Sequence, residues 1–102
     1  MIPDSAIDMF KALSDPNRLR IFDMLSRGET CSCKLLEALS ISQPTLSHHM
    51  GILQKGGLVR GRRDGQWIHY SVDPDAVHEL IGYLESVSSS DRANGAEGPE
   101  AN

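Results

Sequence analysis

Apolar residues in the first half of the chain recur at helical intervals and predict four consecutive helices. From Ser5 to Leu13 they lie three residues apart, which places them on one face of a first helix. The next three helices each begin at a residue whose side chain can cap a helix, and two of these starts carry a proline that the first turn tolerates. Gly28 and Gly56-Gly57 end the second and fourth helices. The capping residues are Asp15, Thr30 and Ser42.

The side chains on the apolar face of each helix are expected to form the core. Residues three and four positions apart lie on the same side of a helix, and burial of that side is what stabilises it in a small protein. The expected core residues are Ile7, Phe10 and Leu13 in the first helix, Leu19, Ile21, Phe22, Met24 and Leu25 in the second, Leu35, Leu36 and Leu39 in the third, and Leu46, Met50 and Leu53 in the fourth.

After Gly57 the pattern becomes that of strands. Residues 58–63 and 66–72 predict two strands joined at Asp64-Gly65, a dipeptide typical of two-residue hairpin turns. Asp73-Pro74 repeats the cap-and-proline start and opens a last helix. Residues 88–102 contain no large apolar side chain, so they cannot offset the entropy lost on ordering and are expected to be a disordered tail. The apolar side of the last helix carries Val77, Leu80, Ile81 and Leu84.

The predicted order is α-α-α-α-β-β-α, which is that of a winged helix-turn-helix of the mainly α (α+β) class. Residues 1–87 are expected to form this domain, because a chain of 102 residues has the size of one small domain. The first and last helices each carry an apolar stripe and have little core left to cover. They either pack on their own subunit or pair across a two-fold axis. We favour a homodimer with these helices as its interface, because most helix-turn-helix proteins read two half-sites.

The overall charge hides a basic segment. The net charge of −4 and the pI near 5.4 by themselves argue against nucleic-acid binding. Residues 40–72, however, contain Asp64 as their only acidic residue against four basic ones, Lys55, Arg60, Arg62 and Arg63. The segment that includes the fourth helix and the hairpin is therefore basic within an acidic chain.

The chain has no segment with the length and apolarity of a membrane span. Its N-terminal sequence MIPDSAIDMF lacks the basic and apolar regions of a secretory signal. We therefore expect a cytoplasmic protein without a membrane partner.

The fourth predicted helix presents polar side chains suited to DNA bases. Glutamine pairs well with adenine in the major groove, serine and threonine suit several bases, and the N–H groups at a helix N-terminus bind phosphate. An ordinary solvated face is the alternative, but the hairpin that follows favours DNA. The expected base contacts are Gln43, Thr45, Ser47 and His48, whereas His49 is interpreted as a packing residue beside Met50.

The hairpin is interpreted as the wing. Its arginines suit phosphate and minor-groove contacts, although arginine is also common on the solvated edge of a sheet. We assign Arg62 and Arg63 to the DNA backbone. Trp67 and Tyr70 are expected to pack the wing onto the body of the protein.

The two cysteines, Cys31 and Cys33, lie at the start of the third predicted helix. A pair separated by one residue is a poor structural disulfide, and in a cytosolic protein it is more typical of a metal or redox site. Positions i and i+2 of a regular helix point about 200° apart, so both thiolates can bind one ion only if the first turn opens. A helix N-terminus and the charge of Lys34 favour the thiolate form, and thiolates select soft ions. Redox sensing and two buried structural thiols are the alternatives.

The chain resembles the ArsR/SmtB family of metal-responsive repressors, most of all its arsenic-responsive branch. The resemblance implies a homodimeric winged-helix repressor, not an enzyme, that needs no cofactor to bind an imperfect inverted repeat in promoter DNA. It also implies that DNA is released when As(III) or Sb(III) binds Cys31 and Cys33 as the metal site. It covers residues 5–87 and rests on the segments FKALSDPNRLRIFDML, ETCSCKLL, SISQPTLSHHMGILQKGGLV and RRDGQWIHYSV.

The chain departs from the branches of this family at several ligand positions. The founding arsenic-sensing motif has a third cysteine where this chain has Leu36, so arsenite would need a third ligand such as glutathione or hydroxide. The cadmium- and lead-sensing branch adds cysteines from an N-terminal extension, and the chain has none there. The zinc-sensing branch has Asp, His and Glu ligands on the last helix, whereas the aligned residues here are Pro74, Asp75, Ala76, Val87 and Ser90.

Several rival functions use the same features. A redox-sensing repressor, or one that responds to cadmium or lead, would use the same cysteines on the same scaffold. A small thiol enzyme, such as an arsenical reductase, needs a base near a cysteine and a substrate pocket, and the sequence indicates neither. A protein-binding adaptor is disfavoured by the basic wing.

Overall fold

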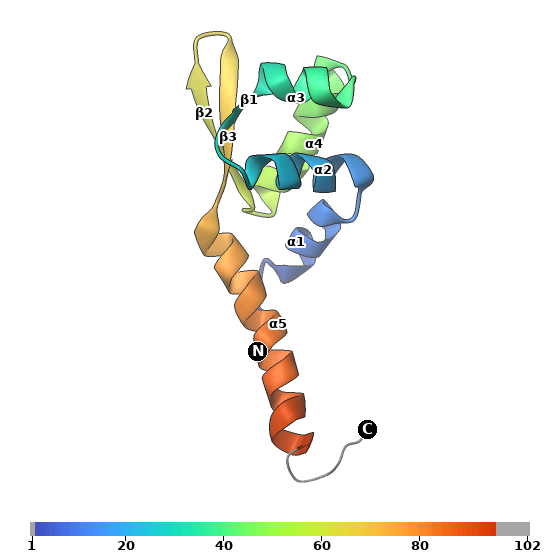
Figure 1. The fold of residues 1–102 in the computed structure, drawn as a ribbon, viewed down its shortest axis with the longest axis vertical. Helices are drawn as coiled ribbons and strands as arrows, with labels where there is room; N and C mark the ends of the chain where they lie inside the picture. The colour runs from blue at the N-terminus through green and yellow to red at the C-terminus, as the bar shows by residue number, and fades with distance from the viewer. Residues whose placement is uncertain (1, 96–102) are drawn as a thin grey trace.

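A computed structural model of the protein describes residues 2–95 (Figure 1). It confirms the predicted winged helix-turn-helix and adds a short strand before the third helix. The strands form one antiparallel sheet in the order β1-β3-β2. The elements are α1 (Ala6–Leu13), α2 (Pro16–Leu25), β1 (Thr30–Cys31), α3 (Ser32–Leu39), α4 (Gln43–Lys55), β2 (Val59–Asp64), β3 (Trp67–Val72) and α5 (Pro74–Gly95).

The helix-turn-helix consists of α3 and α4. Ser40 ends α3 in the left-handed conformation, and Ser42 caps α4 by accepting a hydrogen bond from the N–H of Thr45 at 3.3 Å. The predicted core residues of α4, Leu46, Met50 and Leu53, are all buried. The cap and the apolar stripe together determine which side of α4 faces the solvent.

The first helix buries a different face from the one predicted. Its buried residues are small or flexible, whereas Ile7 and Phe10 are 59% and 39% exposed. The reason is that α1 packs very closely on the end of α4: a Cβ atom at Gly56 would lie 3.2 Å from the carbonyl oxygen of Asp8. Only small or unbranched side chains fit on this side of α1, which buries Ala6, Met9 and Ala12.

The second helix follows the prediction in part. Asp15 caps it by accepting hydrogen bonds from the N–H groups of Asn17 and Arg18. Ile21 and Leu25 are buried as expected, whereas Leu19 is 52% exposed. Leu19 lies two positions before Ile21 and is therefore on the opposite side of α2 from the buried residues.

The third helix begins later than predicted. Thr30 is not its capping residue, because Thr30 and Cys31 pair with Tyr70 and His69 of β3 and form β1. Cys31 takes the capping position instead. On α3, Leu35 and Leu39 are buried as predicted, and Leu36 is partly buried against the same core.

The wing, formed by β2 and β3 (residues 59–72), turns one residue later than predicted. Asp64 pairs with Trp67, so the two turn residues are Gly65 and Gln66 rather than Asp64 and Gly65. Gly65 has a φ of +65°, which glycine adopts without a steric penalty. A positive φ at the first turn residue is the arrangement that hairpins prefer, and this places the glycine there.

The last helix is longer than expected. Asp73 caps it through the N–H groups of Asp75 and Ala76, and its backbone continues past Val87 to Gly95. Residues 88–94 contain no glycine or proline that would end the helix, so residues 88–95 extend it although they were expected to be disordered. Residues 96–102 of the expected tail lie outside the described residues.

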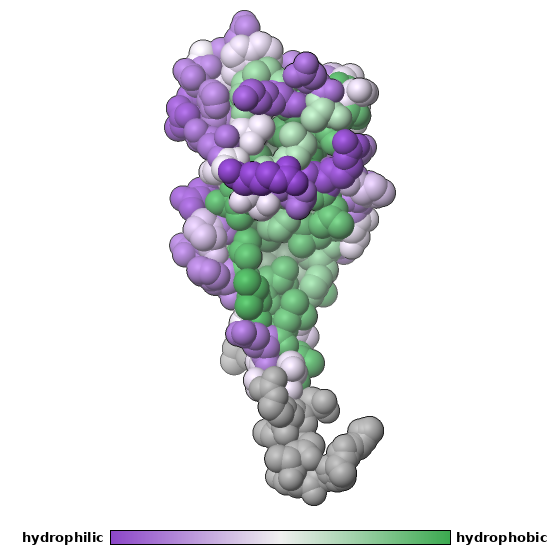
Figure 2. All heavy atoms as spheres, viewed as in Figure 1, coloured by the Kyte–Doolittle hydropathy of each residue, from purple (hydrophilic) through white to green (hydrophobic). Residues whose placement is uncertain are grey.

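Apolar side chains remain exposed on α1 and α5. Figure 2 shows an apolar area just below the middle of the molecule, above the atoms drawn in grey, where Figure 1 places α1 and the first part of α5. None of the helices in the described part of the chain has both the length and the apolarity needed to cross a membrane. The exposed large apolar residues of the two helices, called the apolar surface below, are Ile7, Phe10, Ile81, Leu84 and Val87.

Candidate functional site

The polar face of α4 lies where the sequence predicts it. Gln43, Thr45, Ser47 and His48 are all exposed, near the N-terminus of the helix. The hydroxyl of Thr45 accepts a hydrogen bond of 2.9 Å from that of Ser42, which holds its side chain at the helix start. The four side chains therefore form one solvent-facing group at the end of a helix whose opposite side is fixed in the core.

His49, next to this group, points the other way. It is buried, as its interpretation as a packing residue requires, and its Nδ1 atom lies 3.2 Å from Nη1 of Arg18. Burial lowers the pKa of His49 below its ordinary value of 6.5, because the charged imidazolium would lose its hydration.

The arginines of the wing differ in their surroundings. Arg62 forms a two-point ion pair with Glu29, with Nη2 to Oε1 at 3.0 Å and Nε to Oε2 at 3.3 Å. This hydrogen bonding holds the pKa of Glu29 below its ordinary value and raises that of Arg62. Nε of Arg60 lies 3.6 Å from the carboxylate of Asp73 at the start of α5. Arg63 is exposed and has no ion-pair partner among residues 2–95.

The register of the wing explains this difference. Successive side chains of a strand point to opposite faces, so Arg62 and Arg63 lie on opposite faces of the sheet. Arg62 shares its face with its pairing partner His69, whose Nε2 lies 3.2 Å from the carboxylate of Asp64. Arg63 shares the other face with Tyr70, which is buried against the body.

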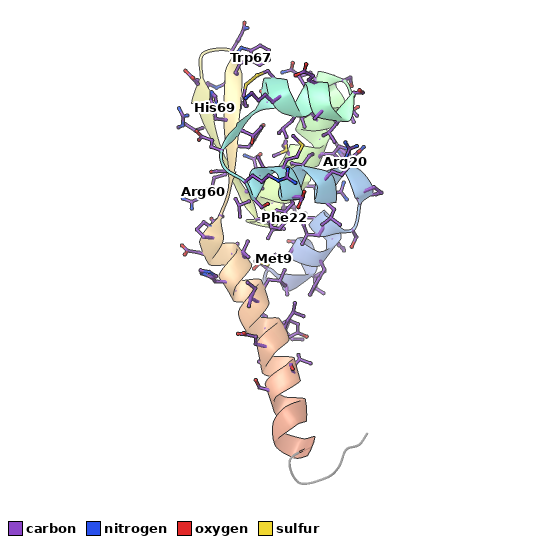
Figure 3. The ribbon with its side chains drawn as sticks, viewed as in Figure 1. Met9, Arg20, Phe22, Arg60, Trp67 and His69 are labelled. Carbon is purple, nitrogen blue, oxygen red and sulfur yellow. A yellow bond between two sulfur atoms is a disulfide. The ribbon has the colours of Figure 1, made fainter. Side chains whose placement is uncertain are left out.

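The two aromatic residues of β3 follow the same alternation. Tyr70 packs the wing onto the body as predicted, and burial raises the pKa of its hydroxyl. Trp67 does not pack in this way: it is 36% exposed near the tip of the hairpin, on the same sheet face as His69 (Figure 3).

The two cysteines are brought together at the start of α3. Cys31 and Cys33 are joined by a disulfide, with their Cα atoms 5.2 Å apart (Figure 3). The expected divergence of the two side chains is wrong, because Cys31 is not within the helix. It has extended backbone angles (φ −69°, ψ 142°) as the capping residue, and its sulfur accepts a hydrogen bond of 3.2 Å from the N–H of Cys33. The helix need not open for the two sulfur atoms to meet.

The segment that carries Cys31 is attached to the wing. Cys31 pairs with His69 of β3, the hydroxyl of Ser32 accepts a hydrogen bond from the N–H of Ile68, and Glu29 holds Arg62. No group of three or more His, Cys, Asp or Glu side chains that could hold a metal ion occurs in the part of the chain that the structure describes. Both cysteines are partly buried, so once reduced they can hold a ligand that needs two sulfurs, with any further ligand supplied from outside these residues.

Sequence reasoning missed Glu29 and Arg18. Glu29 directly precedes the cysteine segment, and an acidic residue there is a weak signal, because its partner Arg62 is far away in the chain. Arg18 follows the Asp15-Pro16 helix start and reaches His49 only through the packing of α2 on α4.

A helix-turn-helix followed by a two-stranded wing defines the winged-helix class of DNA-binding proteins, in which the second helix of the motif, here α4, is the recognition helix. The sequence profile described as "Bacterial regulatory protein, arsR family" matches residues 15–60. Together with relatives that are 40% or more identical over about four fifths of the chain, this match shows that the chain belongs to the ArsR family and is a DNA-binding transcriptional repressor of that family.

Similar proteins agree with this assignment. The chain is 44% identical to an arsenical resistance operon repressor from Staphylococcus xylosus over 82% of its own length and 81% of that protein. It is 40% identical to an uncharacterized HTH-type transcriptional regulator from Methanocaldococcus jannaschii, over 82% of the chain and 96% of that protein. Among solved structures, a possible transcriptional regulator for arsenical resistance superposes with a TM-score of 0.70 at 28% identity, covering 91% of this chain and 98% of the other.

Proposed function

We propose that the chain is a homodimeric repressor that binds promoter DNA in the absence of an inducer and releases it when As(III) or Sb(III) binds Cys31 and Cys33. One observation carries the proposal: the two cysteine sulfurs meet at the start of α3, the helix next to the recognition helix. The similarity to a repressor named for arsenical resistance supports the choice of ion.

In the proposed DNA complex, the recognition helices of the two subunits enter successive major grooves of an imperfect inverted repeat, about 34–36 Å apart. Gln43, Thr45, Ser47 and His48 contact base edges, and the exposure of all four supports this role. Arg62 and Arg63 contact the phosphate backbone. Arg63 is free to do so, whereas Arg62 must exchange Glu29 for a phosphate or contact both.

The apolar surface on α1 and α5 supports the homodimer. A monomer would leave five large apolar side chains of this surface in water. Pairing the same surface of two copies across a two-fold axis buries them and places two recognition helices in one assembly.

The thiol site suits a soft ion that prefers sulfur. Two thiolates bind the ion, and the third position of As(III) is taken by a small thiol or hydroxide, because Leu36 supplies no ligand. Ion binding requires that the two sulfurs be reduced. The disulfide form of the protein should therefore not respond to arsenite.

The attachment of β1 to the wing supports a path from ion to DNA. An ion on the sulfur of Cys31 competes with the hydrogen bond that this sulfur accepts from the N–H of Cys33. A shift of Cys31 moves its pairing with His69 and the nearby Glu29–Arg62 ion pair. Such coupling between an effector site and DNA is typically worth about 1–3 kcal/mol, and by linkage DNA weakens ion binding to the same extent.

A redox-responsive repressor is the second candidate, and the disulfide between Cys31 and Cys33 favours it. Hydrogen peroxide would oxidise the two thiols to this disulfide, with loss of two protons and two electrons, and would itself be reduced to two molecules of water. The same attachment to the wing would then carry the signal.

Fluorescence anisotropy of a labelled promoter duplex separates the candidates. Reduced protein is titrated onto the duplex and then exposed in parallel to arsenite, cadmium, zinc or peroxide. We expect release by arsenite, loss of that release in both Cys31→Ser and Cys33→Ser, and normal release in Glu37→Gln, a control on the exposed side of α3.

Three results would count against the arsenite proposal. Normal release by arsenite in both cysteine variants would remove the thiols from the mechanism. Release by peroxide alone would establish the redox candidate. Absence of DNA binding by the reduced protein would contradict the repressor function itself.

A further inference from the structure

The guanidinium of Arg18 joins three helices through hydrogen bonds. Its Nε donates to the carbonyl oxygen of Ala12 at 2.8 Å and its Nη2 to that of Lys11 at 3.4 Å. Both carbonyls belong to the last turn of α1, where a helix cannot supply partners for its own carbonyl groups. Its Nη1 lies 3.2 Å from Nδ1 of His49 on the recognition helix. Arg18, on α2, therefore connects the end of α1 to α4.

The chemistry of this contact requires a neutral His49. A guanidinium can only donate, so Nδ1 of His49 must accept and the ring proton must be on Nε2. The charged groups around the ring are Arg18 and the Asp15 carboxylate, 4.0 Å from Nδ1, with His48 adjacent on α4. The N–H groups of Arg18 and Asn17 hold Asp15 in place and keep its pKa below its ordinary value.

His49 also holds α4 in place from the side opposite to its exposed polar residues. The residue before it, His48, and Ser47 face the solvent among the expected base contacts, whereas His49 points into the protein. Just after α4, Gly56 lies against the backbone of Asp8 and Met9. The recognition helix is thus connected to α1 at its middle, through the polar contact of His49 with Arg18, and at its C-terminal end, through Gly56.

We propose that Arg18 and His49 are positioning residues for DNA binding: they set the angle of the recognition helix relative to α1 and so the separation of the two reading helices in the dimer. The inference rests on the proposed function, because α1 supplies Ile7 and Phe10 to the surface that is proposed to pair. Neither residue touches DNA in this scheme. Their effect falls on the simultaneous binding of two half-sites.

This role predicts a specific defect. When one half-site is bound, the second recognition helix binds its half-site at an effective concentration that depends on the separation of the two helices. If this separation does not match the spacing of the half-sites, the added affinity from binding both is lost. Breaking the Arg18–His49 contact should lower affinity for a complete inverted repeat by about tenfold or more. It should leave affinity for a single half-site nearly unchanged.

The experiment compares two duplexes: the promoter inverted repeat and the same duplex with one half-site scrambled. His49→Leu and Arg18→Met remove the acceptor and the donors. His49→Asn is the rescue variant, because its side-chain oxygen can accept where Nδ1 did. Arg27→Met is the matched control, since Arg27 is exposed just after α2 and pairs only with Asp23 in the described part of the chain. Thermal unfolding and sedimentation show whether each variant is folded and dimeric.

We expect His49→Leu and Arg18→Met to lose the preference for the complete repeat, and His49→Asn and Arg27→Met to keep it. Equal losses on both duplexes, or no loss on either, would overturn the proposal. A pH series on the unsubstituted protein gives the same test without a folding risk. Protonation of His49 should lower the ratio of complete-site to half-site affinity as the pH falls below 6.5, because the pKa of His49 lies below that value, and His49→Asn should not show this. A constant ratio would contradict the proposal, whereas failure of the unsubstituted protein to bind either duplex would overturn the proposed function and this inference with it.

Discussion

On the recognition helix, Gln43, Ser47 and His48 have no side-chain hydrogen-bond partner within residues 2–95, and α4 is held in place from its buried side. On the wing, Arg60 and Arg62 already contact carboxylates that belong to other segments. The side chains proposed to contact bases are therefore unpaired within the described residues and lie on a helix that packs on the core. On the wing, Arg60 and Arg62 are each paired with another part of the molecule, whereas Arg63 has no ion-pair partner among residues 2–95.

This difference suits α4 and the wing to two different tasks, sequence recognition and signal-dependent backbone binding. The net charge of the chain does not distinguish these tasks. A helix that reads bases benefits from side chains that are unpaired before DNA arrives, because no internal contact must be broken. A wing whose arginine is paired with Glu29 can respond to what happens at the neighbouring Cys31. We expect substitutions on α4 to change which sequence is bound, and substitutions on the wing to change how tightly and under which signal.

The largest expected effect comes from Gln43→Ala. A good bidentate base contact is worth about 1–3 kcal/mol of discrimination, so binding to the operator should weaken by that amount while binding to unrelated DNA stays the same. Competition binding against a scrambled duplex measures this. An equal loss of affinity for both duplexes would show that Gln43 contacts the backbone. The proposed division of base contacts to α4 and backbone contacts to the wing would then be wrong.

Arg63→Ala should weaken binding to all sequences and lower the salt slope of the binding constant by about 1. Arg62→Ala should act in the same direction but to a smaller extent, because Glu29 already holds this guanidinium. Titrations at several salt concentrations measure both slopes. Equal slopes for the two variants would mean that the ion pair does not compete with phosphate.

Glu29→Gln should tighten DNA binding slightly and weaken the response to arsenite. The variant removes the carboxylate partner of Arg62, which leaves the guanidinium available to phosphate and loosens the link between Cys31 and the wing. Asp23→Asn is the control, because Asp23 also forms an exposed ion pair with an arginine, Arg27, within its own helix end and not with the wing. A full arsenite response in Glu29→Gln would assign the coupling to the strand pairing alone.

His49 should make folding stability depend on pH. Its pKa in the folded protein is below the ordinary 6.5, so the unfolded chain binds the proton more readily. Stability is then highest above pH 6.5 and decreases as the pH falls from 6.5 toward the folded-state pKa. Chemical denaturation at several pH values should give a shallower slope in this range for His49→Asn, and an unchanged slope would mean that His49 is not the group responsible.

The smallest effect is expected from removal of residues 90–102. Val77 and Leu80, the α5 side chains that pack against the core, and the α5 part of the apolar surface all lie before residue 90. Thermal unfolding and sedimentation should be nearly unchanged. Loss of the dimer in this variant would show that the distal part of α5 belongs to the interface.

The recognition helix could be predicted almost completely because its determinants are local. Ser42, the proline in the first turn and the spacing of Leu46, Met50 and Leu53 are all within one segment, and together they determine which residues face outward. The face of α1 could not be predicted in the same way. Its larger residues suggested the core side, but the close approach of Gly56 selects alanine and methionine there.

The sequence identified the two cysteines of the thiol site but not the backbone arrangement that brings their sulfur atoms together. Strand β1 has only two residues, and it forms because β3 offers them a pairing edge, which no local pattern reveals. That pairing keeps Cys31 outside the helix and lets the two sulfurs meet. The ion pair of Glu29 with Arg62 and the contact of Arg18 with His49 are equally remote in sequence.

The sulfur of Cys31 is also the cap of α3, since it accepts the N–H of Cys33. Sulfur is a weak acceptor, and a serine hydroxyl at this position is among the best helix caps. Cys31→Ser should therefore give a protein that is at least as stable as the reduced original and that, under the proposed function, does not respond to As(III). In the reduced protein the cap of α3 does not require cysteine at position 31, so the proposed response to As(III) can be lost without a loss of stability.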